Sequence, residues 1–227
     1  TGGSSGGGGG GTASTPKIAI NGLKNPIGEI QMNVGDLKDE TEAKKSLPSM
    51  VTLLVDNKKI KDVTAKIKNG AFDGNTAGSY TFVGTVKIPE GYAYSNGTLT
   101  ANATVTVKAL DKTAFDKALK DAEAKLAEFV DLTTESDVAA KATKTDKIYI
   151  VPDETDASAI TKGVKFVLQK DAIAYETLKA TISNAKQGVD AGGAKKFDSQ
   201  KECDEMTAKL KADMDAVDKM TKQTGTN

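Results

Sequence analysis

The pattern of apolar and polar residues changes its period between Val107 and Asp111. Upstream, residues 98–107 alternate small or apolar side chains with polar ones, which is the period of a half-buried strand. Downstream, apolar residues recur at helical spacing, at Phe115, Leu119, Ala122, Leu126 and Phe129. The chain is therefore predicted to consist of two unlike domains that meet near residue 110.

The first half of the chain carries short strand-like segments that are separated by turn signals such as Asn21–Gly22 and Asn96–Gly97. The predicted strands are Lys17–Ile20, Gly28–Val34, Met50–Val55, Lys59–Lys68, Ser79–Ile88 and Thr98–Val107. The charged residues 36–47 are predicted to form a helical turn or an exposed loop. Short strands with turns at this spacing favour an antiparallel sandwich.

The second half of the chain is predicted to be mainly helical. The first helix is expected from Asp111, its N-cap, to about Val130, and the second from about Lys170 to Val189. The third begins at Ser199, since Ser199 and Glu202 have the spacing of a capping box. Because each helix has one apolar face, the simplest arrangement is a three-helix bundle.

A less regular segment separates the first two of these helices. Ser136–Ala142 has the composition of a short helix, whereas Lys147–Val151 and Val164–Leu168 have that of β-strands. A structureless loop of this length inside a compact bundle would be unusual. The two β-like stretches are therefore predicted to pair as a small hairpin insert.

These patterns predict four segments. Residues 1–15 are a glycine- and serine-rich linker, because such a stretch buries too little apolar surface to become ordered. Residues 16–109 form the β domain, residues 110–222 form the helical domain, and residues 223–227 are expected to be a second linker. Both ends therefore suggest a piece of a longer protein.

The composition limits the chemistry that is available. The 227 residues contain no His and no Arg, and all 31 basic residues are Lys, balanced by 31 acidic ones. Nucleic-acid binding is not expected without Arg or net positive charge, and His-based catalytic sets and typical zinc sites are excluded. No apolar run is long enough for membrane insertion. We expect no cofactor, no metal ion and a monomeric state.

A few residues are candidates for ligand binding, nucleophilic chemistry or metal coordination. Tyr92 and Tyr94 could stack on a sugar ring as an aromatic platform, although an ordinary loop with one tucked tyrosine explains them more simply. Cys203 lies on the apolar stripe of the third helix, which favours a buried, inert thiol. The acidic clusters 36–42 and 153–156 lack the spacing of a calcium loop and are interpreted as solvated loops.

Residues 50–57, 63–66 and 75–86 together resemble the bacterial Ig-like domains often called group 4. The resemblance rests on a Val–Thr hairpin at Val51–Thr52 and on the strand pattern Ala77–Gly78–Ser79–Tyr80–Thr81–Phe82, which continues to Val86. Lys66–Ile67–Lys68 stands where that group usually has a tryptophan. The resemblance implies an immunoglobulin-like sandwich of the kind found in bacterial surface proteins and extracellular enzymes.

The second half is similar to the FIVAR module, a small helical repeat of bacterial cell-surface and secreted proteins. The matching stretches are residues 111–119, which are typical of the start of that module, and residues 162–167 leading into Asp171–Ala172. The predicted fold class is thus multidomain, with an all-β immunoglobulin-like sandwich followed by an α-helical three-helix bundle that carries a small β-hairpin-like insert.

Together the two resemblances imply a non-catalytic spacer, and a candidate ligand-binding segment, of a multimodular bacterial protein that is extracellular or attached to the cell wall. The candidate partners are a host or dietary glycan or a surface protein. The alternative is a carbohydrate-binding or adhesion module, accessory to a glycan-degrading enzyme, that uses Tyr92 and Tyr94. A third hypothesis, an enzyme, would need carboxylate or lysine chemistry in a concave site.

Overall fold

The computed structural model describes residues 14–55, 58–68, 72–189, 193 and 195–227, with the backbone alone for 58–68. The chain divides into two compact units, one comprising residues 1–32 and 37–109 and the other residues 33–36 and 110–227. We refer to them as the β unit and the α/β unit. Most of the predicted linker at residues 1–15 lies outside the described residues.

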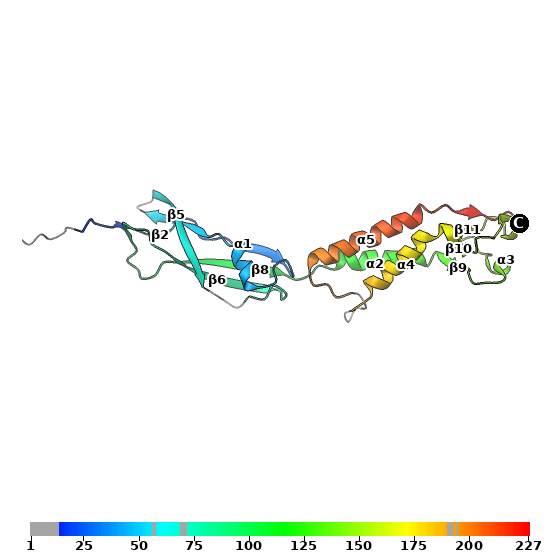
Figure 1. Cartoon of the computed structure of the whole chain (residues 1–227), viewed down its shortest axis with the longest axis horizontal. Helices are drawn as coiled ribbons and strands as arrows, with labels where there is room; N and C mark the ends of the chain where they lie inside the picture. The colour runs from blue at the N-terminus through cyan, green and yellow to red at the C-terminus, as the bar shows by residue number, and fades with distance from the viewer. Residues whose placement is uncertain (1–13, 56–57, 69–71, 190–192, 194) are drawn as a thin grey trace, which may run out of the picture. The chain divides into compact units, whose positions relative to one another are not determined.

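The β unit contains a six-stranded sheet with the order β2-β4-β5-β6-β8-β3 and a separate parallel pair, β1 and β7 (Figure 1). The elements in chain order are β1 (Ile18–Ala19), β2 (Gly22–Leu23), β3 (Ile30–Asn33), α1 (Glu40–Ser46), β4 (Met50–Val55), β5 (Lys58–Lys68), β6 (Gly78–Val86), β7 (Tyr92–Ala93) and β8 (Thr100–Lys108). The charged segment that was predicted as a helical turn or loop contains the short helix α1.

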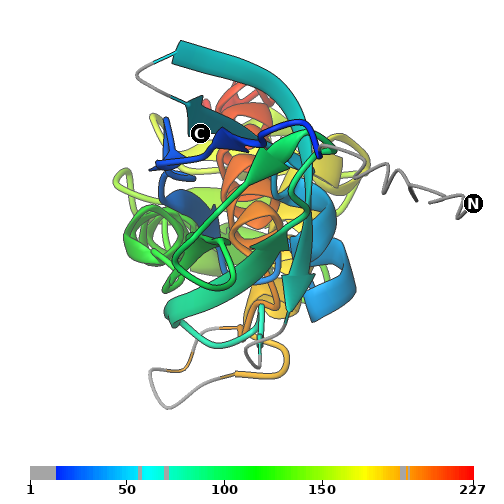
Figure 2. The ribbon, with the colours of Figure 1, turned by 90° about the vertical axis from the view of Figure 1, so that its left-hand side faces the viewer.

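The predicted immunoglobulin-like sandwich is wrong, because the six strands form one hydrogen-bonded sheet. Strand β5 connects the two halves of the sheet. Its first residues pair with β4, from Val55↔Lys58 to Met50↔Thr64. Its last residues pair with β6, from Lys68↔Val83 to Ala65↔Val86. Figure 2 shows the twist of this sheet. Alternation along each strand shows which side chains point inward but not which strands become neighbours.

The pairing of β6 and β8 is the longest ladder in the β unit, running in register from Gly78↔Val107 to Thr85↔Thr100. Along β8 the side chains of Ala101, Ala103, Val105 and Val107 are buried, while those between them are partly or fully exposed. The alternation predicted for residues 98–107 is thus confirmed. These inward side chains, together with Leu53 and Phe82, supply much of the core of the unit.

The α/β unit mixes helices with a four-stranded sheet. Its elements are α2 (Thr113–Leu126), β9 (Phe129–Asp131), α3 (Val138–Lys141), β10 (Ile148–Val151), the 3₁₀ helices η1 (Ala157–Ala159) and η2 (Gln169–Asp171), β11 (Lys165–Leu168), α4 (Ile173–Ala185), α5 (Gln200–Asp218) and β12 (Gln223–Thr224). The sheet order is β12-β11-β10-β9, in which β9, β10 and β11 are parallel and β12 is antiparallel.

The predicted three-helix bundle with a hairpin insert is therefore also wrong. The stretches expected to form the hairpin are β10 and β11, and they pair in parallel from Ile148↔Lys165 to Val151↔Leu168. A parallel pair needs a crossover, which residues 152–164 provide. The sequence showed that both stretches are apolar strands, but it carried no signal for their direction, nor for the recruitment of β9 and β12 to the same sheet.

The two faces of this sheet are buried by different elements. Phe129, Ile150 and Val167 point to the helical side, where they join a core that includes Phe115, Leu178 and Leu210 from α2, α4 and α5. Tyr149, Val151 and Phe166 point to the other side, where Ala142, Ile160 and Val164 of the crossover segments cover them. Figure 1 shows the helices at one end of the unit and the strands at the other.

The predicted cap of α5 is observed, whereas that of α2 is not. Ser199 is the N-cap of α5, and its side chain accepts a hydrogen bond from the backbone N–H of Glu202, as the capping box predicted. The Glu202 carboxylate in turn accepts from the N–H of Asp198 at 3.1 Å, one residue before the cap. Helix α2 begins at Thr113 with Lys112 as its N-cap, so the prediction of Asp111 as the cap is wrong, although the Asp111 carboxylate accepts from the Thr113 N–H at 2.9 Å. The helix ends at Leu126 and not near Val130, because the chain turns there into β9, which contains Phe129.

Residues 223–227, which were expected to be a linker, pack against the sheet. After β12, the Gly225 N–H donates to the carbonyl of Val164 at 2.9 Å, and the Asn227 N–H donates to that of Ile160 at 3.1 Å. A Cβ on Gly225 would lie 2.4 Å from the carbonyl oxygen of Thr161 and 2.5 Å from that of Ile160. The tail therefore fits closely only because residue 225 has no side chain.

Candidate functional site

An open cavity of about 450 Å³ lies at the β9 edge of the sheet in the α/β unit. Residues from the end of β9, the segment around α3 and the start of β10 line it: Val130, Asp131, Leu132, Glu135, Lys141, Lys144, Lys147 and Tyr149. Its volume is within the range of small-molecule sites, roughly 300–1,000 Å³. We call it the β9 pocket.

Local hydrogen bonds shape the wall of the β9 pocket. The carboxylate of Asp131 accepts from the backbone N–H of Thr133 at 3.0 Å and from its hydroxyl at 2.8 Å, which turns the chain after β9. Asp137 caps α3 by accepting from the Ala140 N–H at 3.0 Å. Both turns lie within the same crossover, and they shape its backbone on either side of Glu135.

Tyr149 places Lys144 at the pocket. The phenolic oxygen of Tyr149 accepts a hydrogen bond of 3.1 Å from the backbone N–H of Lys144. The tyrosine is 3% exposed, and its ring belongs to the core on that face of the sheet. Its hydroxyl still has a proton to donate. A buried ring therefore fixes the backbone of a lysine and brings a hydroxyl group to the lining of the pocket.

The lysines and carboxylates of the pocket are not all paired with one another. Lys141 forms an ion pair with Glu135, and the Lys147 ammonium donates to the carbonyl of Ala127 at 2.6 Å. Within the described part of the chain, the Lys144 ammonium has no hydrogen-bond or ion-pair partner. Since the lining holds three lysines and two acidic residues, it carries an excess positive charge.

The carboxylate of Asp131 is ionised at neutral pH. Hydrogen bonding from the Thr133 backbone lowers the pKa of Asp131, with smaller contributions from the Thr133 hydroxyl and the Lys179 charge, against the opposing effect of partial burial. The pocket therefore presents fixed charges of both signs, which favours a ligand that has both an anionic group and hydrogen-bond donors.

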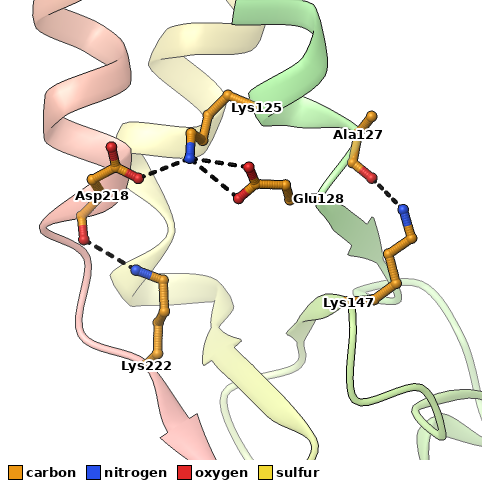
Figure 3. A network of polar contacts seen from close by, with 6 residues as sticks. All are labelled: Lys125, Ala127, Glu128, Lys147, Asp218 and Lys222. Carbon is orange, nitrogen blue, oxygen red and sulfur yellow. Dashed lines mark hydrogen bonds and ion pairs between the residues drawn. The ribbon is translucent and has the colours of Figure 1, made fainter. Parts of the chain in front are cut away.

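A polar network next to the pocket ties the ends of α2 and α5 to the start of β9 (Figure 3). The Lys125 ammonium lies 3.0 Å from carboxylate oxygens of both Asp218 and Glu128, and Lys222 donates to the Asp218 carbonyl at 3.1 Å. The hydrogen bond with Asp218, followed by that with Glu128, raises the pKa of Lys125. In the same view Lys147 reaches from the pocket to Ala127.

The structure places Tyr92 and Tyr94 in the β unit. Both rings are half-buried and pack against a core cluster that includes Ile20 and Leu53. Tyr92 lies in β7, and its N–H donates to the carbonyl of Pro89 at 3.3 Å. The two tyrosines therefore contribute to the core of their unit, and their role as a sugar platform stays a prediction.

The other candidates, Cys203 and the acidic clusters at residues 36–42 and 153–156, make contacts that support the fold. Cys203 is 1% exposed, and burial raises the pKa of its thiol, which disfavours the reactive thiolate. In the acidic clusters, Asp39 caps α1 and Asp156 caps η1, while Asp153 accepts from the Lys170 N–H at 2.8 Å. Over the described ranges, no group of three or more Cys, Asp or Glu side chains is arranged to hold a metal ion.

None of the residues of the β9 pocket was nominated from the sequence. One signal was available, since Lys141, Lys144 and Lys147 recur every third residue from the end of the predicted short helix to the start of the predicted strand. That spacing alone does not distinguish a binding wall from a solvated loop. The contribution of Asp131 and Tyr149 depends on the parallel pairing of β9 with β10, which the sequence did not predict.

No protein-family model and no curated protein matches the chain. Among solved structures, the chain is similar to the crystal structure of the N-terminal domain of group B Streptococcus alpha C protein, with 12% identity, 90% of this chain and 92% of that chain covered, and a TM-score of 0.22. A TM-score of this size supports no inference about fold or function.

In the described ranges, none of the helices combines the length and the apolar character needed to cross a bilayer.

Proposed function

We propose that this chain is a non-catalytic spacer segment of a multimodular bacterial protein that is extracellular or attached to the cell wall. The observation that carries the proposal is the path of the chain through each unit, which enters at one end and leaves at the other (Figure 1). Chain termini often lie close together in domains. Opposed ends instead separate the entry and the exit of each unit by the length of that unit.

In the α/β unit the distance covered is at least the length of α5. Asp111, at the start, donates its N–H to the side chain of Gln200 at 2.8 Å and accepts from it at 3.0 Å, so it lies at the first turn of α5. Asn227 bonds to Ile160 and Lys162 beyond the other end of the helix. A helix of 19 residues is about 28 Å long.

In the β unit, too, the chain enters at one end and leaves at the other. Strand β1 pairs with β7, just before β8 in the chain, and the Val86 N–H donates to the carbonyl of Leu99 at 2.9 Å. The chain therefore begins near the start of β8 and leaves the unit at its end. A strand of nine residues extends about 30 Å. The β6–β8 ladder pairs this strand from Thr100 to Val107.

The paired charges also support a structural role. Several ion pairs join different elements, among them Lys125–Asp218 between α2 and α5 and Lys186–Glu123 between the C-cap of α4 and α2. Others act within one helix, as Lys209–Asp213 does in α5. The bacterial surface location draws on the resemblances of residues 50–86 and 111–119 to modules of such proteins.

Single-molecule stretching of the full chain tests the spacer proposal. We expect the end-to-end length to stay constant after the N-terminal glycine tract is extended, and then to increase in cooperative steps as a unit unfolds. Gradual lengthening at low force would contradict the proposal. The substitution Lys211→Gln, at an exposed site on α5, is a matched control that should leave the trace unchanged.

The alternative, a carbohydrate-binding or adhesion module, would use the surface around Tyr92 and Tyr94. Because both rings pack against the core, less aromatic area is available for a sugar than on an open platform. A glycan array compares the two functions directly. Glycan binding that is lost when both tyrosines are replaced by Ala would favour the alternative. The absence of binding to any glycan on the array would count against it.

A further inference from the structure

We propose that the β9 pocket binds a small organic acid with one carboxylate that is flanked by hydrogen-bond donors, either hydroxyl or ammonium groups. This inference goes beyond the spacer role and is independent of it. Three parts of the pocket fit such a ligand: an unpaired cation, two partly free carboxylates and an apolar strip.

The unpaired cation is the ammonium of Lys144. The neighbouring ammonium groups are engaged, that of Lys141 by Glu135 and that of Lys147 by the carbonyl of Ala127. Lys144 is held at the wall through its backbone by Tyr149 and has no side-chain partner in the described ranges. It can therefore pair with a ligand carboxylate without breaking a contact that holds the fold, and the Tyr149 hydroxyl can donate a further hydrogen bond.

The two acidic residues leave acceptors for the rest of the ligand. Asp131 uses Oδ1 for the turn at Thr133, and Glu135 uses Oε2 for Lys141. The second oxygen of each carboxylate has no hydrogen-bond partner among the described residues. Ionised carboxylates are acceptors only, so they select hydroxyl or ammonium donors on the ligand.

This charge arrangement distinguishes between classes of ligand. Inorganic phosphate has too much negative charge and too few donors, so Asp131 and Glu135 would repel it. A neutral sugar has donors but leaves Lys144 without an anionic partner. A monocarboxylate with adjacent donors satisfies both sets of groups, and Val130 and Leu132 offer apolar surface to its carbon skeleton. The volume of about 450 Å³ accommodates a molecule of the size of a sugar acid or a dipeptide.

NMR titration of the isotope-labelled full chain tests the proposal with four probes: D-glucuronate, glycylglycine, D-glucose and inorganic phosphate. We expect saturable shifts of the amides of Asp131, Leu132 and Lys144 with glucuronate or with glycylglycine. The first result identifies hydroxyl donors and the second identifies ammonium donors. No saturable shift with either acid, or equal affinity for glucose or phosphate, would overturn the proposal.

Two substitutions separate the contributions of charge and shape. Lys144→Gln removes the unpaired cation and should weaken acid binding about tenfold, whereas Lys211→Gln on α5 should have no effect. Asp131→Asn keeps an acceptor oxygen for Thr133 but removes a negative charge, so it should weaken the acids and strengthen phosphate. An unchanged preference in Asp131→Asn, or unchanged acid affinity in a folded Lys144→Gln protein, would contradict the assignment.

Discussion

The hydroxyl of Thr181 on α4 donates a hydrogen bond of 2.5 Å to the carboxylate of Asp213 on α5. Thr181 is 2% exposed, and the same carboxylate oxygen lies 3.0 Å from the Lys209 ammonium. A partly buried carboxylate between two helices is costly unless its partners are present. This contact is therefore expected to stabilise the pairing of α4 with α5.

Replacing Thr181 by Val should reduce the free energy of unfolding by about 1–2 kcal/mol, because it leaves the Asp213 carboxylate short of a donor. Urea denaturation measures the change. Thr177→Val is the matched control, since Thr177 is exposed on the same helix and donates only to the carbonyl of Ile173. Equal effects of the two substitutions would contradict a specific role for the interhelical bond.

Replacing Gly225 by Ala should detach the C-terminal tail from the sheet, because the new Cβ would lie within 2.5 Å of two carbonyl oxygens. Hydrogen exchange should become faster at the amide of residue 225 and at those of Lys162 and Asn227. Gly28→Ala, at a site with no atom within 4 Å of the added carbon, should leave these rates unchanged. Retained protection at these three amides would show that the tail tolerates a side chain.

The ion pair between Lys195 and Glu202 should make the stability of the α5 start depend on pH. The Lys195 ammonium at 2.8 Å, followed by the Asp198 N–H, lowers the pKa of Glu202. A carboxyl group whose pKa is lowered in the folded state stabilises the native state fully when the pH is above its ordinary pKa. This contribution is lost as the pH falls through the lowered pKa.

Glu202→Gln should therefore destabilise the protein at pH 7 and make no difference at a pH well below the lowered pKa of Glu202. The effect should stay below about 1 kcal/mol, since the pair is partly exposed and screened by solvent. Denaturation at both pH values measures it. Glu205→Gln, in the 3.7 Å pair with Lys201, should have little effect at either pH. A Glu202→Gln effect that grows toward acid would contradict this linkage.

Each unit has its own core, so a cavity in one core should lower the stability of that unit. Leu53 and Leu210 are both 0% exposed, the first in the β unit and the second in the α/β unit. Truncating either to Ala should cost about 2–5 kcal/mol. Calorimetry should show Leu53→Ala and Leu210→Ala lowering different transitions, while Val83→Ala, at an exposed position, changes neither. A single transition that both core substitutions lower equally would contradict separate cores.

The period of the apolar pattern predicted β8 and most of α2. The alternation before residue 108 predicted β8 and the helical spacing after it predicted α2 as far as Leu126, because both periods depend on neighbouring residues alone. The same spacing wrongly continued the helix to Phe129, which lies in β9. Ser199 as the start of α5 was predicted for the same reason, since a cap is formed within a single turn. The buried state of Cys203 also followed from its place on an apolar stripe.

Only the tertiary structure decided which strands pair, and with which direction. The parallel pairing of β10 with β11, the continuous sheet through β5 and the packing of residues 223–227 each depend on edges that are distant in sequence. The β9 pocket belongs to the same class, because it brings Asp131, Lys144 and Tyr149 together through the crossover between β9 and β10. The sequence by itself determined local periods and caps. The tertiary structure decided the sheets and the pocket, since backbone hydrogen bonds between strands do not depend on side-chain identity.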